Sequence, residues 1–352
     1  MAPAAQADGL PVHLVDNEEQ CNGDELGELS HGKQSGSSVI PCPPRPRECV
    51  TAADIDLIVQ SVEFVLIDFH THTTASDGAL SPEQLVDRAL QRDLRLFAIT
   101  DHDTMAGYQA AAEYYTRIGG EMTLLAGIEF SCRWSGLTVH VVGLGVNCNH
   151  PALQDGIDRL TRARLDRATV IAERLSQRGF CGALQGALEA AGSSQPGRPH
   201  FAAWMVEQGH VKDMPQAFDR YLGQGKVGDV KAFWPELAEV VAWIVAAGGV
   251  AVLAHPLKYR LTRSKLRRLV ADFQDAGGTA IEILSGYQTP DQSRQLRTLA
   301  QECGLEVSAG SDFHRDSSWG PDLGVELRHL GELCGVWERW SGPPSCLPGG
   351  QP

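Results

Sequence analysis

Between residues 64 and 330, short apolar runs alternate with segments of helical periodicity, and this alternation constrains the fold of the 352-residue chain more than any other feature. Apolar runs that predict buried strands cover residues 65–69, 96–100, 123–131, 138–145, 250–254, 280–284 and 306–309. The first predicted helix has Ser81 as its N-cap and Pro82 at its first position. About seven such units predict an α/β fold, a (β/α) barrel that is complete or one unit short.

A long helical stretch interrupts the alternation. From residue 151 to about 221, apolar residues recur at helical spacing with no strand between them. We therefore expect a helical insertion over about 150–235, inside a domain that covers 64–330. Residues 1–60 are rich in Gly, Ser, Pro and acidic residues, a composition that predicts a disordered or loosely attached extension, and 341–352 are predicted to be a flexible tail.

The overall charge and the chain start limit the partners to expect. A formal net charge of −14 offers no broad basic surface for long nucleic acid, so duplex DNA is not an expected partner. Residues 1–5 lack the basic region and apolar run of a secretion signal, and apolar stretches such as 240–253 are too short to cross a bilayer. We expect a cytoplasmic protein with no membrane partner, and the sequence predicts no oligomeric state.

Histidines and acids collect directly after the predicted strands. His70 and His72 lie two residues apart on an extended segment, so their side chains point the same way. The strand-end residues with metal-ligand chemistry are His70, His72, Asp77, His102, Glu129, His255, Asp312 and His314. The carboxyl ends of barrel strands meet at one face, and imidazole with carboxylate suits Mn, Fe or Zn. The sequence therefore predicts a multinuclear metal centre.

Two further histidines have alternatives that the pattern leaves open. In Arg198-Pro199-His200, the proline stiffens the geometry between the arginine and the histidine. His200 is either a metal ligand or only a feature of a helix start. His140 begins a predicted strand, and the pattern does not decide whether it faces the site or packs elsewhere.

Basic and aromatic residues suggest contacts to a phosphorylated substrate. Arg198 is the first candidate to bind a phosphate, because a planar guanidinium holds two phosphate oxygens at once, and Arg133 is a weaker candidate. Two further basic clusters, in 159–178 and 258–268, would favour a second phosphate or an RNA 5′ end, although a solvated surface explains most of them. Aromatic candidates to stack a base are Phe201, Trp204, Phe233 and Trp234, with core packing as the alternative.

The order of these motifs resembles the PHP (polymerase and histidinol phosphatase) family of metallophosphoesterases. The matching motifs are Asp-x-His-x-His-Thr (68–73), Ser-Asp-Gly (76–78), Thr-Asp-His-Asp (100–103), Gly-Ile-Glu (127–129), Arg-Pro-His (198–200), Ala-His-Pro (254–256) and Ser-Asp-x-His (311–314). Within the family, the chain is more similar to bacterial nucleoside 3′,5′-bisphosphate phosphatases that also act as 5′-to-3′ exoribonucleases on short RNA. Residues 142–145 and 198–200 carry that closer similarity.

The resemblance implies a distorted (β/α)7 barrel that holds three divalent metal ions, Mn²⁺ first, with Fe²⁺ or Zn²⁺ as alternatives. Transferred by position, the ligands are His70, His72, Glu129 and Asp312 for one ion, Glu129, His200 and His255 for a second, and Asp77, His102 and His314 for the third. His140 is the alternative second-ion ligand or a group that faces the substrate.

The expected reaction is removal of the 3′-phosphate from a nucleoside 3′,5′-bisphosphate, or 5′-to-3′ trimming of short RNA. Hydroxide held between two ions bridged by Glu129 would attack phosphorus, and Arg198 would neutralise the charge that develops. His140 would donate a proton to the leaving oxygen, and Arg198, His140 and Arg133 would contact the substrate.

Three alternatives compete with this function. The first is a histidinol phosphate phosphatase. The second is a metal-dependent amidohydrolase, whose barrel motifs also begin with His-x-His, although no lysine suited to carbamylation stands at a mid-chain strand end. The third is a catalytically silent binding module, against which the intact ligand set argues.

Overall fold

The computed structural model describes residues 65–230, 233–316, 321–327 and 333–340. The extension predicted for 1–60 and the tail predicted for 341–352 lie outside these ranges. Within the described ranges, no helix is both long enough and apolar enough to cross a membrane.

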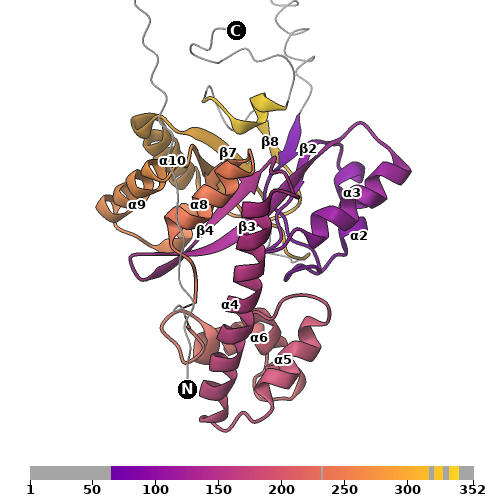
Figure 1. Cartoon of the computed structure of the whole chain (residues 1–352), viewed down its shortest axis with the longest axis vertical. Helices are drawn as coiled ribbons and strands as arrows, with labels where there is room; N and C mark the ends of the chain where they lie inside the picture. The colour runs from indigo at the N-terminus through magenta and orange to yellow at the C-terminus, as the bar shows by residue number, and fades with distance from the viewer. Residues whose placement is uncertain (1–64, 231–232, 317–320, 328–332, 341–352) are drawn as a thin grey trace, which may run out of the picture. The chain divides into compact units, whose positions relative to one another are not determined.

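One eight-stranded sheet forms the centre of the domain (Figure 1). Its strands are β1 (Leu66–Asp68), β2 (Leu94–Ile99), β3 (Thr123–Trp134), β4 (Leu137–Leu144), β5 (Val250–Leu253), β6 (Ala280–Ser285), β7 (Glu306–Gly310) and β8 (Val325–Glu326). The order across the sheet is β7-β6-β5-β4-β3-β2-β1-β8. The first seven match the predicted strands, and the short β8, which the sequence did not predict, pairs with β1.

The sheet curls until its ends meet. The Asp312 N–H donates to the His70 carbonyl at 2.8 Å, and the His72 N–H donates to the Phe313 carbonyl at 2.9 Å. These bonds join the segment after β1 to the segment after β7, so the sheet is a nearly closed barrel and the predicted α/β barrel class is confirmed. Gly310 allows this close approach, because a Cβ on it would lie 2.4 Å from Cβ of His70.

Strand β4 departs from the regular βα alternation. It runs antiparallel to both of its neighbours, β3 and β5. A two-residue loop joins β3 to β4, and its residues Ser135 and Gly136 have φ values of 47° and 77°, as a tight hairpin with right-handed twist requires. The start of β4 therefore lies beside the carboxyl end of β3, where His140 pairs with Ser131.

Helices pack against the barrel through their apolar sides. They are α2 (Pro82–Gln91), α3 (Ala106–Ile118), α8 (Leu237–Ala246), α9 (Arg263–Asp275) and α10 (Pro290–Cys303), with a 3₁₀ turn η2 (Pro256–Tyr259) after β5. The predicted cap of α2 is present, because the Ser81 hydroxyl accepts from the Gln84 N–H and the Gln84 side chain accepts from the Ser81 N–H.

Between β4 and β5 the chain forms a helical insertion. Its elements are α4 (Pro151–Ser176), α5 (Ala183–Ala191), α6 (Arg198–Glu207), α7 (Met214–Ala217) and the π-helix η1 (Phe218–Leu222). Figure 1 shows α4 running from the barrel to α5 and α6. Leu153 and Leu160 of α4 belong to the barrel core, whereas Ile171 and Leu175 belong to a separate core of the insertion. Helix α4 therefore links the two cores.

Candidate metal centre

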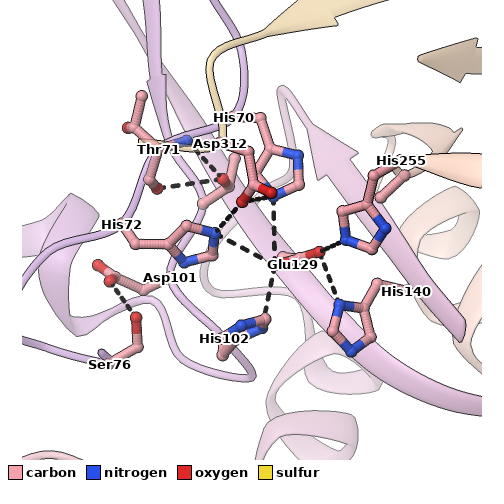
Figure 2. Close-up of polar contacts among 12 residues, drawn as sticks. His70, Thr71, His72, Ser76, Asp101, His102, Glu129, His140, His255 and Asp312 are labelled. Carbon is pink, nitrogen blue, oxygen red and sulfur yellow. Dashed lines mark hydrogen bonds and ion pairs between the residues drawn. The ribbon is translucent and has the colours of Figure 1, made fainter. Parts of the chain in front are cut away.

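Glu129 of β3 is the hub of a cluster of histidines at the carboxyl end of the barrel (Figure 2). It is fully buried. Its Oε2 lies 3.2 Å from His70 Nε2, 3.3 Å from His72 Nε2 and 3.0 Å from His102 Nδ1. Its Oε1 lies 2.8 Å from His140 Nδ1 and 2.9 Å from His255 Nε2. One carboxylate thus faces five imidazoles from four segments of the chain, since His70 and His72 both follow β1.

Asp312 completes one side of this cluster. Its Oδ1 lies 3.5 Å from His70 Nε2 and 3.4 Å from His72 Nε2, and its other oxygen pairs with Lys258. Asp312 and His255 both adopt positive φ, 53° and 29°, at the ends of their strands. Non-glycine residues rarely adopt such φ values. Strained backbone conformations of this kind cluster at functional sites, where the surrounding structure enforces them.

A second group lies beside the first. It consists of His72, Asp77, His102 and His314, whose ligand atoms all lie within 4.8 Å of one another. Asp77 Oδ1 lies 3.4 Å from His314 Nε2, and Asp77 Oδ2 lies 3.9 Å from His102 Nε2. Because His72 and His102 belong to both groups, the two form one continuous centre.

The electrostatics of the centre are dominated by acids and imidazoles that are buried together. Burial alone would raise the pKa of Glu129, but His70, His102 and His140 outweigh it and hold that pKa well below its ordinary value. Burial alone would lower the pKa of His70, yet Glu282, Glu129 and Asp312 raise it well above its ordinary value. The centre therefore favours ionised carboxylates and attracts positive charge.

Several buried ligand atoms in the centre have no hydrogen-bond partner among the described residues. They are His70 Nε2, His72 Nδ1 and Nε2, Asp77 Oδ1, His102 Nδ1, Glu129 Oε2 and His255 Nδ1. Such atoms are costly to bury without a partner, and they share the nitrogen and oxygen chemistry of ligands for Mn, Fe or Zn. The donor set therefore fits divalent metal ions.

Glu282 of β6 contacts two histidines of the centre, His70 and His255. Its Oε1 lies 2.7 Å from His70 Nδ1, and its Oε2 accepts from the His255 N–H at 2.6 Å. A carboxylate bonded to the second nitrogen of a ligand imidazole fixes the ring and raises its basicity. Sequence reasoning missed Glu282, although an acid inside the apolar run 280–284 was a signal for a buried, paired carboxylate.

The structure places His140, rather than His200, beside Glu129 and His255. His140 reaches them because β4 runs antiparallel and brings its early residues to the carboxyl end of the barrel. Among the described residues, His200 makes no hydrogen bond or ion pair with Glu129 or His255. The Gly197 N–H donates to His200 Nδ1 at 3.0 Å at the start of α6, and His200 lines a cavity beside the centre. Of the two histidines that the sequence left open for the second ion, His140 is therefore the one that lies beside Glu129 and His255.

Three arginines face that cavity, which Asp77, His102 and His140 line on the side of the centre. Arg164 and Arg167 come from α4 and are buried, and Arg198 comes from the start of α6. Burial, with repulsion from Arg198 and Arg164, lowers the pKa of Arg167 to about 9. Three neighbouring cations in a cavity favour an anion there.

The Arg164 and Arg167 positions were not singled out from the sequence, where most of the basic helix was interpreted as a solvated surface. Arg164 does stand in the apolar stripe of that helix, which was the available signal.

Arg133 is not part of the cavity. It lies near the tip of the β3–β4 hairpin, where its Nε donates to Glu236 Oε1 at 3.0 Å. Arg133 stands four residues after Glu129 on β3, so the strand carries it away from the centre. The prediction that Arg133 contacts the substrate therefore has no support from this position.

Comparison with known proteins places this arrangement in a family. The PHP domain model matches residues 68–174. The 5′-3′ exoribonuclease Rnm of Salmonella typhimurium is 42% identical over 279 residues, which are 79% of this chain and 95% of that protein. The chain belongs to the PHP family. Another relative, the 3′,5′-nucleoside bisphosphate phosphatase of Chromobacterium violaceum, is 40% identical over 80% of this chain and 94% of that protein.

Solved structures agree with the PHP assignment. A structure described as an amidohydrolase from Chromobacterium violaceum, with bound sulfate and no metal, has 39% identity and a TM-score of 0.69 over 78% of this chain and 94% of that one. A structure described as a metal-dependent phosphoesterase from Bifidobacterium adolescentis has 29% identity and a TM-score of 0.64 over 76% and 94% of the two chains. This PHP protein is thus a metal-dependent phosphoesterase, as predicted.

Proposed function

We propose that this enzyme removes the 3′-phosphate from nucleoside 3′,5′-bisphosphates and trims short RNA from its 5′ end. The observation that carries the proposal is the cavity of Arg164, Arg167 and Arg198 next to Asp77, His102 and His140. A substrate with one phosphate at the metal centre and a second phosphate nearby suits that arrangement. The names of the relatives from Salmonella typhimurium and Chromobacterium violaceum support it. We infer a cytoplasmic enzyme that acts on small nucleotides rather than on duplex DNA.

The proposed cofactor is three divalent ions, with Mn²⁺ as the first candidate and Fe²⁺ or Zn²⁺ as alternatives. One ion would be held by His70, His72, Glu129 and Asp312, a second by Glu129, His140 and His255, and a third by Asp77, His102 and His314. When bound, such ions neutralise phosphate charge and lower the pKa of water.

The arginines of the cavity would orient the second phosphate. Arg198 is the least constrained of the three, since its Nη1 donates only to the Leu222 carbonyl at 3.2 Å and lies 3.9 Å from Asp229 Oδ1. Its guanidinium is therefore available to take two phosphate oxygens. Arg164 is held by Asp103 at 2.7 Å, so its position is set before substrate binds.

His200 would face the substrate rather than a metal ion. Its Nδ1 accepts the Gly197 N–H, so in the neutral imidazole Nε2 carries the proton. That Nε2 lies 3.5 Å from Ser194 Oγ, and the His200 ring also hydrogen-bonds to the Ser76 backbone beside Asp77. His200 can therefore donate a hydrogen bond to a phosphate or leaving-group oxygen in the cavity that it lines.

The test is phosphate release from adenosine 3′,5′-bisphosphate by metal-free protein resupplied with Mn²⁺. We expect rapid release that leaves adenosine 5′-monophosphate, and loss of release in Asp77→Ala and His102→Ala. Shortening of a 5′-phosphorylated RNA oligomer from its 5′ end is the second assay. If metal binds but only histidinol phosphate is hydrolysed, the proposed substrate is wrong and the phosphoesterase assignment stands.

A further inference from the structure

We propose that the cavity beside Tyr287 is the nucleobase subsite of the enzyme and that the Tyr287 ring stacks on a substrate base. The inference rests on the proposed function and extends it to the recognition of the base. Tyr287 follows β6, in a loop at the carboxyl end of the barrel, and Gly286 turns this loop with a φ of 62°. No motif in the sequence singled out this tyrosine.

Tyr287 is unusually exposed for a large aromatic residue. Its side chain is 73% exposed, whereas the other exposed large apolar residues of the described chain, Ile118, Leu165 and Val245, lie on helices and are 45–49% exposed. Tyr287 lines a cavity together with three residues of the metal centre, His255, Asp312 and His314. An aromatic face in water beside a phosphate-hydrolysing centre is suited to stack a base, since every base offers an aromatic face.

The same cavity contains polar groups suited to the edge of a base. Ser285 is 4% exposed, and its hydroxyl has no hydrogen-bond partner among the described residues. Gln288 also lines the cavity, and its Oε1 accepts from the Ser285 N–H at 3.3 Å, so its amide N–H groups are the donors that it can offer to a ligand. A buried hydroxyl without a partner is unfavourable, so a ligand that bonds it gains affinity.

A third cavity has lining residues in common with both this cavity and the arginine cavity. It shares Arg198 and His140 with the arginine cavity and shares Lys258 with the Tyr287 cavity. The arginine and Tyr287 cavities have no lining residue in common, so they reach the centre from different sides. A nucleotide can therefore place one phosphate among the arginines, the reacting phosphate at the centre and its base against Tyr287.

The aromatic residues expected from the sequence do not offer such a face. Phe201 and Trp204 are buried in the core of the insertion, and Phe233 is half-buried and packs against both cores. Trp234 lines the arginine cavity but is 6% exposed, with the guanidinium carbons of Arg164 and Arg167 at 5.4 Å and 5.1 Å from its ring centre. Among the aromatic residues that line the three cavities, Tyr287 is the one with a freely exposed ring.

The experiment compares two substrates, adenosine 3′,5′-bisphosphate and the corresponding ribose 3,5-bisphosphate without a base, on the Mn²⁺-loaded enzyme. Tyr287→Ala is expected to raise KM for the nucleotide about tenfold, because stacking on an aromatic ring contributes on that order, and to leave KM for the sugar bisphosphate unchanged. Tyr287→Phe keeps the ring and should stay within about twofold of the wild type. Ser285→Ala should raise KM for the nucleotide several-fold and spare the sugar bisphosphate.

The control variant is Ile118→Ala, which removes an exposed apolar side chain at the end of α3. If Tyr287→Ala changes neither substrate, or changes both equally, the nucleobase subsite is wrong while the proposed function stands. If wild-type enzyme hydrolyses neither substrate, the proposed function fails. Calorimetry then tests the subsite separately, by measuring how adenosine 5′-monophosphate and ribose 5-phosphate bind to the same variants. If Tyr287→Ala weakens binding of the nucleotide alone, the subsite is supported. If the variant affects both ligands equally, the subsite is overturned.

Discussion

Arg164 and Asp103 form a buried ion pair that joins the helical insertion to the barrel. Arg164 Nη2 lies 2.5 Å from Asp103 Oδ2, and Arg164 Nε donates to the same oxygen at 2.7 Å. Asp103 directly follows His102 and accepts the Ser131 N–H at 2.6 Å through its other oxygen. A single carboxylate therefore links Arg164 of the arginine cavity to strand β3, and it stands next to His102 of the metal centre in the chain.

Replacing Asp103 with asparagine tests this link between the arginine cavity and the barrel. Loss of the charge leaves Arg164 buried without its partner, and breaking such a pair costs about 3–5 kcal/mol. We expect Asp103→Asn to lower the melting temperature by about 5 °C or more and to raise KM for a nucleoside bisphosphate about tenfold, while bound metal stays unchanged. Calorimetry, kinetics and metal analysis measure the three effects, with the exposed Asp158→Asn on α4 as the control. An unchanged KM would contradict the proposed link.

Arg198 and Arg174 form a matched pair for testing phosphate binding. Each donates one hydrogen bond to a backbone carbonyl, Arg198 to Leu222 at 3.2 Å and Arg174 to Val227 at 3.3 Å, but only Arg198 lines the cavity. Arg198→Met should raise KM at least about tenfold, since a charged hydrogen bond contributes about 1.5–3 kcal/mol. Arg174→Met should leave KM unchanged. Equal effects of the two variants would place the phosphate elsewhere.

His140 and His200 differ in the effect that we expect on metal content. His140→Ala removes a partner of Glu129 Oε1, so metal analysis after dialysis should show about one ion fewer per chain. His200→Ala should keep the full metal content and lower kcat. The opposite pattern would restore His200 as the ligand that the sequence suggested.

Glu282 should control metal affinity without touching the substrate. Glu282→Gln removes the charge that faces His70 Nδ1 at 2.7 Å, and changes of this kind typically weaken metal binding 10- to 100-fold. Titration of metal-free protein with Mn²⁺ measures the affinity. Glu306→Gln on the neighbouring strand β7, where the acid pairs with Arg339, is the control. With saturating metal, KM of Glu282→Gln should equal that of the wild type, and a raised KM would show that Glu282 acts on the substrate side.

Metal removal should lower stability as well as activity. Ions that bind only the folded chain stabilise it by mass action, and at a hundredfold excess over Kd the gain is about 2.7 kcal/mol. We expect chelation to lower the melting temperature of the wild type by several degrees and Mn²⁺ to restore it. Glu129→Gln should show a much smaller response, because its carboxylate contacts five of the histidines. If the melting temperature of the wild type did not change when metal is removed or added, that result would contradict a metal centre that stabilises the fold.

Local patterns were sufficient for the strands and for the residues that leave their ends. His70, His72 and Asp312 were predicted at the centre because each follows a buried apolar run by one to three residues, and parallel strands bring such positions together. The cap of α2 was equally local, since its two partners stand three residues apart.

Strand direction and exposure were decided by the tertiary structure. An alternating apolar pattern is the same whether a strand runs parallel or antiparallel, so it could not show that His140 reaches Glu129. Nor could a basic helix show which arginines turn inward, since Arg164 is buried only because Asp103 and Trp234 lie opposite it. Short segments of sequence were enough to predict the barrel and the ligand-type side chains at its strand ends, because both depend on residues that are close in the chain. Which histidine completes the centre, which arginines line the cavity and where Tyr287 faces depend on residues far apart in the chain, and only the packed fold brings those together.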